Sequence, residues 1–319
     1  MNAASATPDD PAWPALPYEA WKDTCETLQL WTQIVGKVRL ARTPWLNHSW
    51  HVPLYVTARG LGTGPIAHDR QSFDMEFDFV DQALRVRTSG GGMKAIRLEP
   101  MSVATFYKAV LGTLGDLGVP VTIDGAPNEV VEAVPFKDDR RPRAYDPDYA
   151  RRFWRVLLQA DRVLGLFRTA FLGKCSPVHF FWGSFDLAVT RFSGRRAPPH
   201  PGGAPHLPDA VVREAYSHEV SSAGFWPGGG AIDYPAFYAY AYPEPAGFRD
   251  AQMAPPGAFY SLELSEYLLP YDVARAAADP DQAVLAFLGS TSGAAADAGK
   301  WDRVALECDL GRPRVVRPT

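Results

Sequence analysis

Residues 176–195 read SPVHFFWGSFDLAVTRFSGR, and the prediction of the fold starts from this stretch. Polar side chains recur in it among aromatic and β-branched residues, which is typical of a β-strand whose two faces differ. A regular strand divides these side chains between two faces, with Ser184, Asp186 and Thr190 on one and His179, Phe185 and Arg191 on the other. A bulge at Gly183 would change this division.

Long helices are predicted around the strand-like segments. Four helices are predicted where apolar residues recur at steps of three and four: Tyr18 to about Leu40, Ser102 to Leu117, Asp148 to about Phe171, and a last helix that begins at Asp279. Asp279 is a suitable N-cap, and Pro280 after it is well placed for the first helical position. The order helix, antiparallel strands, helix therefore occurs twice.

This order predicts an α+β protein made of two related helix, antiparallel-strand, helix units that form one compact unit with a central cleft. The first half is residues 13–124, a Pro- and charge-rich linker is 125–147, and the second half is 148–305. The strings LYVTARGLG (54–62) and LAVTRFSG (187–194) indicate an internal duplication with a spacing of about 130 residues.

Composition restricts the class of protein. The chain has 319 residues, 46% hydrophobic content and a formal net charge of -4, so no nucleic-acid partner is expected. Its three cysteines form no CxxC pair, which argues against a zinc ribbon or a disulfide framework. The opening residues lack the pattern of a secretory signal, and no stretch reaches the ~18 apolar residues of a membrane span. We therefore expect a soluble cytoplasmic protein without a membrane partner.

Common catalytic and nucleotide-binding motifs do not match. GLGTG (60–64) is followed by Pro65 and a polar loop, where a phosphate-binding helix would have to begin. FLGKCSP (171–177) lacks the upstream glycine of a P-loop. The sequence has no GxSxG elbow, no HExxH pair and no EF-hand loop. The cofactor is therefore left unknown.

The candidate site residues are polar or aromatic groups in strand-like segments, where an ionisable side chain needs a partner. Imidazole and carboxylate groups are suited to acid–base chemistry near neutral pH or to holding a transition metal, and no spacing decides whether a metal is bound. The predicted catalytic residues are His179, His218, Glu219 and Asp186, and the predicted substrate-binding residues are Arg191, Trp182, Trp226 and His51. The adjacent His218 and Glu219 are expected on opposite faces of a strand.

Three hypotheses for function remain open. The first is a small-molecule enzyme with a His, carboxylate and Arg site between the two halves, in which Arg191 holds an anionic substrate and a metal is optional. The second is a non-catalytic protein that binds a small ligand in an aromatic cavity. The third is a structural or interaction protein whose histidines are core residues satisfied by hydrogen bonds. A small molecule is the expected partner in the first two, and the oligomeric state is left open.

The sequence resembles a known family over most of its length. NHSWHVPLYVTARGL (47–61), residues 176–195, EAYSHEVSSAGFWPGGG (214–230) and FYAYAYPEP (237–245) are similar to a mainly bacterial family catalogued as domain of unknown function number 5996. The resemblance extends from about residue 13 to residue 305. It implies a family but no reaction, cofactor or catalytic residue. Relatives have histidine at the position of Gln82, so the resemblance supports no role for an imidazole there.

Overall fold

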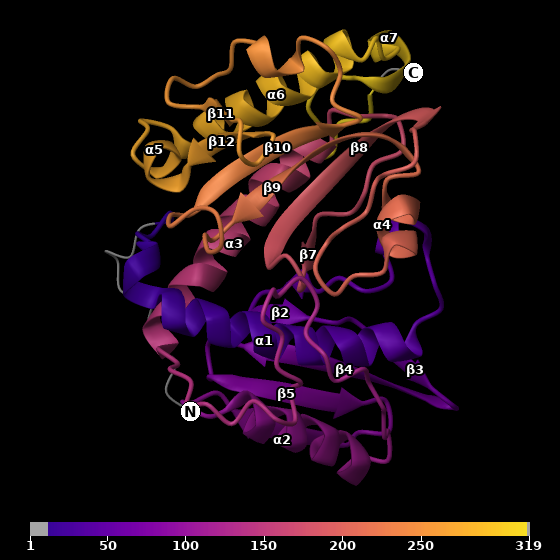
Figure 1. Cartoon of the computed structure of the whole chain (residues 1–319), viewed down its shortest axis with the longest axis vertical. Coiled ribbons are helices and arrows are strands. Elements are labelled where there is room, and N and C mark those ends of the chain that lie inside the picture. Colours follow the sequence, from indigo (N-terminus) through magenta and orange to yellow (C-terminus); the bar gives the residue numbers. More distant parts are fainter. Residues whose placement is uncertain (1–11, 318–319) are drawn as a thin grey trace.

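A long helix, α1 (Tyr18–Arg42), crosses the middle of the molecule and contacts both halves of the chain (Figure 1). The computed structural model describes residues 12–317. The predicted apolar stripe of α1 is buried, but polar residues on its other sides are buried as well. Thr27 donates a hydrogen bond to the carbonyl of Ala144 at 2.8 Å, and the Gln33 amide exchanges two hydrogen bonds with the backbone of Asn128. The helix is therefore covered on nearly all sides, and Thr27 and Gln33 are satisfied by the linker that packs on it.

The first half contains an antiparallel sheet in the order β1, β2, β4, β5, β6, with β3 paired to β4. Its strands are β1 (Tyr55–Val56), β2 (Gly60–Gly62), β3 (Ile66–His68), β4 (Gln71–Asp78), β5 (Ala83–Thr88) and β6 (Met93–Arg97). Helix α2 (Val103–Asp116) begins after Ser102, whose hydroxyl accepts from the N–H of Thr105. Phe106 of α2 stacks on Phe77 of β4 and on Trp31 of α1, so the two helices and this sheet share one core.

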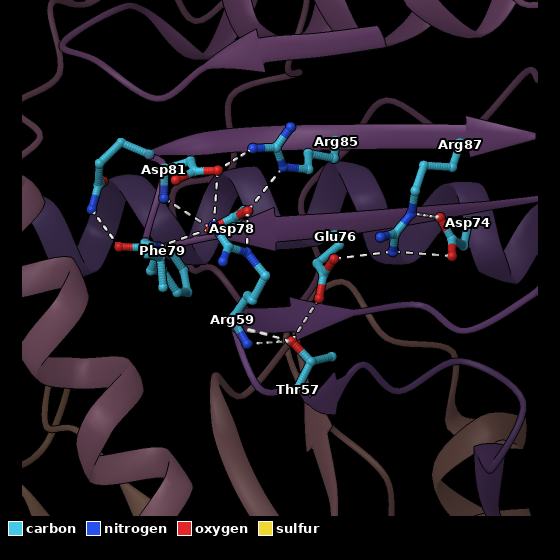
Figure 2. Close-up of polar contacts among 12 residues, drawn as sticks. Thr57, Arg59, Asp74, Glu76, Asp78, Phe79, Asp81, Arg85 and Arg87 are labelled. Atoms are coloured by element: carbon cyan, nitrogen blue, oxygen red, sulfur yellow. Dashed lines mark hydrogen bonds and ion pairs between the residues drawn. The ribbon is translucent and has the colours of Figure 1, made fainter. Parts of the chain in front are cut away.

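The opposite face of this sheet carries paired charges. Figure 2 shows the three acidic residues that alternate with the apolar side chains of β4: Asp74, Glu76 and Asp78. Asp78 is fully buried and accepts hydrogen bonds from Arg59 at 2.6 Å and Arg85 at 2.9 Å. Arg87 lies within 2.8 Å and 3.0 Å of the other two carboxylates. Burial opposes ionisation of Asp78, but the bonds from both arginines and two backbone N–H groups lower its pKa. Each carboxylate of this face thus has a cationic partner.

The second half contains a larger antiparallel sheet in the order β7, β8, β9, β10, β12, β11. Its strands are β7 (His179–Phe181), β8 (Asp186–Arg196), β9 (His218–Trp226), β10 (Ala236–Tyr242), β11 (Phe259–Ser261) and β12 (Glu266–Pro270). Helices α3 (Pro147–Arg168) and α6 (Pro280–Ala298) pack on one face of this sheet. Their N-caps, Asp146 and Asp279, accept hydrogen bonds from the first helical turn. The short helical elements are η1 (Asn47–Ser49), α4 (Asp209–Ala215), η2 (Phe248–Asp250), α5 (Tyr271–Arg275) and α7 (Arg303–Leu306).

Two backbone hydrogen bonds join the two sheets. The N–H of Leu54 donates to the carbonyl of Phe180, and the N–H of Phe180 donates to the carbonyl of Leu54, both at 2.8 Å. Leu54 directly precedes β1 and Phe180 lies in β7, and these are end strands of the two sheets. One hydrophobic core cluster contains buried residues of both halves. The predicted α+β class is confirmed.

The two halves share the order long helix, antiparallel strands, helix. The strings that suggested a duplication do not correspond within this order. LYVTARGLG covers β1 and β2, the first two strands of its half, whereas LAVTRFSG lies within β8, the second strand of the other half. The internal duplication and the cleft between the halves stay predictions.

None of the helices in the described part of the chain is long and apolar enough to span a membrane. Residues 1–11, from which the absence of a secretory signal is predicted, lie outside the described residues.

Candidate functional site

One face of the second sheet is polar and lines two adjoining cavities. The strand register places the following residues on this face: Asp186, Ala188 and Thr190 of β8, Ser222 and Gly224 of β9, Tyr238 and Tyr240 of β10, and Glu266 of β12. Gly224 is required where it stands, because a Cβ atom there would lie 2.1 Å from the backbone carbonyl oxygen of Leu187 and 2.6 Å from the hydroxyl of Tyr238. The missing side chain lets the Tyr238 ring lie across the sheet, so that its hydroxyl reaches β8.

The larger cavity has a volume of about 760 Å³ and lies between this face, α1 and the segment 127–134. This volume falls within the range of about 300–1,000 Å³ that is usual for small-molecule sites. Aromatic side chains line it from several elements, among them Tyr18 of α1, Phe185 before β8 and Trp226 of β9. The cavity therefore combines an aromatic lining with the polar groups of the sheet.

Asp186 lies at the centre of the polar face and is 7% exposed. It follows a four-residue turn, 182–185, that ends in a left-handed residue, Phe185 with φ of 60°. The hydroxyls of Ser184 and Tyr238 each donate a hydrogen bond to one oxygen of its carboxylate. Burial raises the pKa of Asp186, and these two hydrogen bonds oppose the rise. No cation pairs with Asp186 among the described residues, so its carboxyl group is held by hydroxyl groups and its own backbone N–H.

Two glutamates face the same cavity. Glu129 comes from the segment 127–134 in a left-handed conformation, with its N–H bonded to the carbonyl of Pro205 at 2.8 Å. Its carboxylate rests on Gly183, where a Cβ atom would lie only 2.1 Å from it. Glu266 lies on β12 beside Tyr240. Burial, together with the nearby charge of Asp186, raises the pKa of Glu129 and that of Glu266 to about 7 each.

Neutral hydroxyl groups continue the polar face along the sheet. The hydroxyls of Tyr216 and Tyr240 lie 2.7 Å apart, and those of Thr190 and Ser222 lie 2.8 Å apart. Because each hydroxyl can both donate and accept, these pairs can rearrange to bond a ligand. The face thus offers both carboxyl groups and hydroxyl groups.

A smaller cavity of about 130 Å³ adjoins the larger one and shares four lining residues with it: Ser184, Asp186, Tyr238 and Tyr240. His179 also lines it and is 1% exposed, with its ring 4.6 Å from that of Phe181. The Nδ1 atom of His179 is buried without a hydrogen-bond partner among the described residues. Burial, and then the charge of Arg39, lowers the pKa of His179 to about 3, so this imidazole is neutral near pH 7.

The predicted division of residues 179–191 between two faces was wrong for His179. His179 pairs with Ala188, which places it on the same face as Asp186 and Thr190. The sequence was interpreted as one regular strand, whereas the turn at 182–185 separates β7 from β8 and reverses the chain. The structure therefore brings His179 and Asp186 together.

Arg191 lies on the opposite face and cannot hold a substrate in either cavity. Its guanidinium group stacks 3.5 Å from the ring centre of Phe167 and donates to the Phe167 carbonyl at 2.6 Å and to Ser292 at 3.1 Å. Burial lowers its pKa to about 10. Arg191 thus joins the sheet to α3 and α6 and lines neither cavity.

Glu219 and His218 also lie outside the two cavities. Glu219 is paired with Arg195 at 2.7 Å and accepts from Ser193 at 2.8 Å. His218 is half-buried beside Ser217, 6.1 Å from the ring of His48. Neither residue lines the larger or the smaller cavity, so the predicted convergence of histidines, carboxylates and arginine on one site does not occur.

Of the predicted substrate-binding residues, Trp226 lines the larger cavity. Trp182 donates to the carbonyl of Val52 at 2.9 Å and is part of the core. His51 is buried, and its Nδ1 accepts from the N–H of Leu46 at 3.2 Å. It lies between η1 and β1, which begins at Tyr55.

Sequence reasoning missed Glu129 and Glu266 as site residues. Glu129 lies in a segment that was interpreted as linker, and its neighbours in space come from distant parts of the chain. Glu266 could have been found as an acidic residue inside the apolar string LELSEYLLP (262–270). Among the residues that the structure describes, no group of three or more His, Cys, Asp or Glu side chains is arranged to hold a metal ion.

Comparison with known proteins gives one match. The model of a family described as a family of unknown function, DUF5996, matches residues 13–308 of this chain. No protein with a curated description and no solved structure matches the chain.

Proposed function

Because the chain belongs to the DUF5996 family, whose description states no activity, the proposal rests on geometry alone: we propose an enzyme that binds a small organic molecule in the larger cavity and acts on it by general acid–base catalysis. The catalytic groups of this proposal are Glu129, Asp186 and Glu266. The observation that carries it is that these three carboxyl groups face one cavity without a cationic partner among the described residues.

The contrast between the two sheets supports this proposal. On the first sheet, Asp78 and its neighbours on β4 are each paired with arginine, as is usual for buried carboxylates in a structural role (Figure 2). On the second sheet, Asp186 is bonded to two hydroxyl groups and to its own backbone N–H, with no arginine or lysine partner among the described residues. Unpaired carboxyl groups in a cavity are costly for folding, and perturbed groups of this kind concentrate at functional sites.

The three carboxyl groups have different roles in this proposal. Ser184 and Tyr238 hold the Asp186 carboxylate in one orientation, so Asp186 serves to position and stabilise positive charge on the substrate. Glu129 and Glu266, with pKa values of about 7, exchange protons readily near neutral pH and serve as general acid or base. The tyrosine hydroxyls orient the polar groups of the substrate.

A second candidate function is non-catalytic binding of a small ligand. It is favoured by the aromatic lining of the cavity, in which Tyr18 and Trp226 present ring surfaces to the same space. In that case the same carboxyl groups orient the ligand and transfer no proton.

The variant Asp186→Asn tests the proposal. The full chain is incubated with a defined mixture of small metabolites, and consumption of each component is followed by mass spectrometry. We expect the wild type to convert one component, and the variant to convert it about 10²- to 10³-fold more slowly, the usual contribution of one group that stabilises charge in the transition state. The matched control is Glu219→Gln, which changes a carboxylate on the opposite face and should leave turnover unchanged.

Three outcomes decide between the candidates. Equal turnover by wild type and Asp186→Asn contradicts the assignment of Asp186. A component that raises the melting temperature of the wild type but is not converted supports non-catalytic binding. Neither conversion nor a change in melting temperature with any component contradicts both functions.

A further inference from the structure

The charges that line the larger cavity are unbalanced. Six acidic residues line it: Glu26, Glu129, Glu132, Asp139, Asp186 and Glu266. Among the described residues, its cationic lining consists of Arg141 and Arg143, and both are already paired with Asp139, at 2.9 Å and 2.7 Å. Arg143 also lies 3.6 Å from Glu26. The arginines therefore neutralise one edge of the cavity and leave the carboxyl groups at the sheet without a counter-charge.

The aromatic groups beside these carboxyl groups are also suited to positive charge. Trp226 precedes the glycine run 228–230, and Tyr18 packs against the same run. Gly228 and Gly229 have φ values of 96° and 108°, and their missing side chains leave room for the Tyr18 ring, 3.0–3.2 Å from where a Cβ would lie. Ring faces of tryptophan and tyrosine attract cations by about 0.5–2 kcal/mol.

The neutral imidazole of His179 is a separate observation that points to a ligand. It lines the smaller cavity next to Asp186, and its buried Nδ1 has no partner among residues 12–317. A neutral imidazole has one donor and one acceptor nitrogen, and an unsatisfied buried nitrogen costs free energy. A ligand that extends from the larger cavity past Asp186 can satisfy it.

We propose that the ligand of this cavity is an organic amine, whose ammonium group binds among Glu129, Asp186 and Glu266 and whose carbon skeleton lies against Trp226 and Tyr18. This inference rests on the proposed function and specifies its substrate class. The ligand supplies the positive charge that the lining lacks. An anionic substrate, which the sequence suggested through Arg191, is disfavoured by the same carboxyl groups.

Binding of an amine is coupled to proton release. A cation stabilises the ionised forms of Glu129 and Glu266, whose pKa values of about 7 in the free protein then fall. Affinity for an amine therefore rises as the pH increases from 6 to 8. A neutral ligand of the same shape has no such dependence.

The test uses three probes with one ring and different charge: benzylamine, benzyl alcohol and benzoate. Their binding to the full chain is measured by isothermal titration calorimetry at pH 6 and pH 8. We expect benzylamine to bind at least about tenfold more tightly than benzyl alcohol at pH 8, a difference of about 1.4 kcal/mol. Benzoate should bind more weakly than either.

The double variant Glu129→Gln/Glu266→Gln should reduce the preference for benzylamine over benzyl alcohol to less than about twofold. It should also remove the pH dependence, because glutamine neither carries a negative charge nor titrates. The control Glu219→Gln should keep both. If the double variant does not fold, the pH dependence of the wild type still decides, because equal affinities at pH 6 and pH 8 contradict the proposal.

The remaining outcomes separate the substrate class from the site. If benzyl alcohol or benzoate binds as tightly as benzylamine, the assignment of an amine as the ligand is wrong. If Asp186→Asn abolishes the binding of that probe, the cavity is still the ligand site. Binding of none of the three probes overturns the amine assignment, and turnover in the metabolite mixture then tests the cavity independently.

Discussion

Glu129 and Glu266 are uncharged in the folded protein at pH values where the unfolded chain has already ionised them. Burial and the charge of Asp186 raise the pKa of each from 4.5 to about 7. Between these values the folded state binds more protons than the unfolded state, so the free energy of unfolding falls as the pH rises. Above about pH 7 both glutamates are ionised in the folded and in the unfolded state, so their contribution to the free energy of unfolding no longer changes with pH. That contribution then includes the full cost of two buried charges.

Replacing both glutamates by glutamine should remove this pH dependence. We expect Glu129→Gln/Glu266→Gln to melt a few degrees higher than the wild type at pH 8 and to differ little from it at pH 4.5. Melting temperatures measured by circular dichroism between these pH values check the expectation. Glu263→Gln, which changes an exposed side chain, serves as control. If the melting temperature of the wild type exceeds that of the double variant, and does so most at pH 8, the proposed burial of these carboxyl groups is wrong.

At the scale of elements, the arginine network on the first sheet is a structural feature. Asp78 is fully buried and accepts from Arg59, Arg85 and two backbone N–H groups (Figure 2). Asp78→Ala should lower the free energy of unfolding by about 2–3 kcal/mol, because charged hydrogen bonds are lost and their donors are left unsatisfied. Chemical denaturation at pH 7 measures the change.

Glu99→Gln is the matched control for this network. Glu99 pairs with Arg97 at 3.2 Å, and both side chains are more than half exposed, at 54% and 82%. Exposed pairs contribute about 0–1 kcal/mol, so this change should be nearly neutral. Equal effects of Asp78→Ala and Glu99→Gln would show that the network does not stabilise the sheet.

The helices could be predicted from the sequence because their signals are local. Asp146 and Asp279 cap helices whose apolar period is visible in the sequence, and the observed helices begin within a residue of the predicted positions. The turn at 182–185 was not recognised, because Trp182 and Phe185 continue the apolar pattern of the strands on both sides. One missed turn placed His179 on the wrong face.

The site was predictable only in part, because its members meet through long-range contacts. Asp186 is a polar residue and Trp226 an aromatic residue, and both lie in strands in which apolar and polar residues alternate regularly. Both could therefore be identified from the sequence as candidate site residues. Glu129 reaches the cavity because its backbone is fixed by Pro205 and its carboxylate rests on Gly183. Neither contact has a sequence pattern of its own.

The molecule as a whole carries a small net charge, whereas the charges that line the larger cavity are unbalanced. A formal net charge of -4 over 319 residues says little about the cavity, where the acidic groups at the sheet lack a counter-charge while those on the first sheet are neutralised by arginine. Charge balance over the sequence therefore led us to expect no nucleic-acid partner, but it gave no sign of the proposed preference for a cation.

The pair of hydrogen bonds between Leu54 and Phe180 has a consequence for how the molecule opens. These two amides lie at the junction of the sheets, and the core around them belongs to both halves. We expect them to exchange with deuterium only through global unfolding, with protection equal to the full free energy of unfolding. Hydrogen exchange read by mass spectrometry or NMR checks this, with the edge-strand amides of β11 as a fast reference.

Early exchange at Leu54 and Phe180, while β9 and β10 stay protected, would mean that the halves separate first. Otherwise the junction makes the chain a single cooperative unit. A molecule bound in the cavity then slows deuterium uptake across both sheets, including strands that it never touches, so occupancy of the site can be detected at a distance from it.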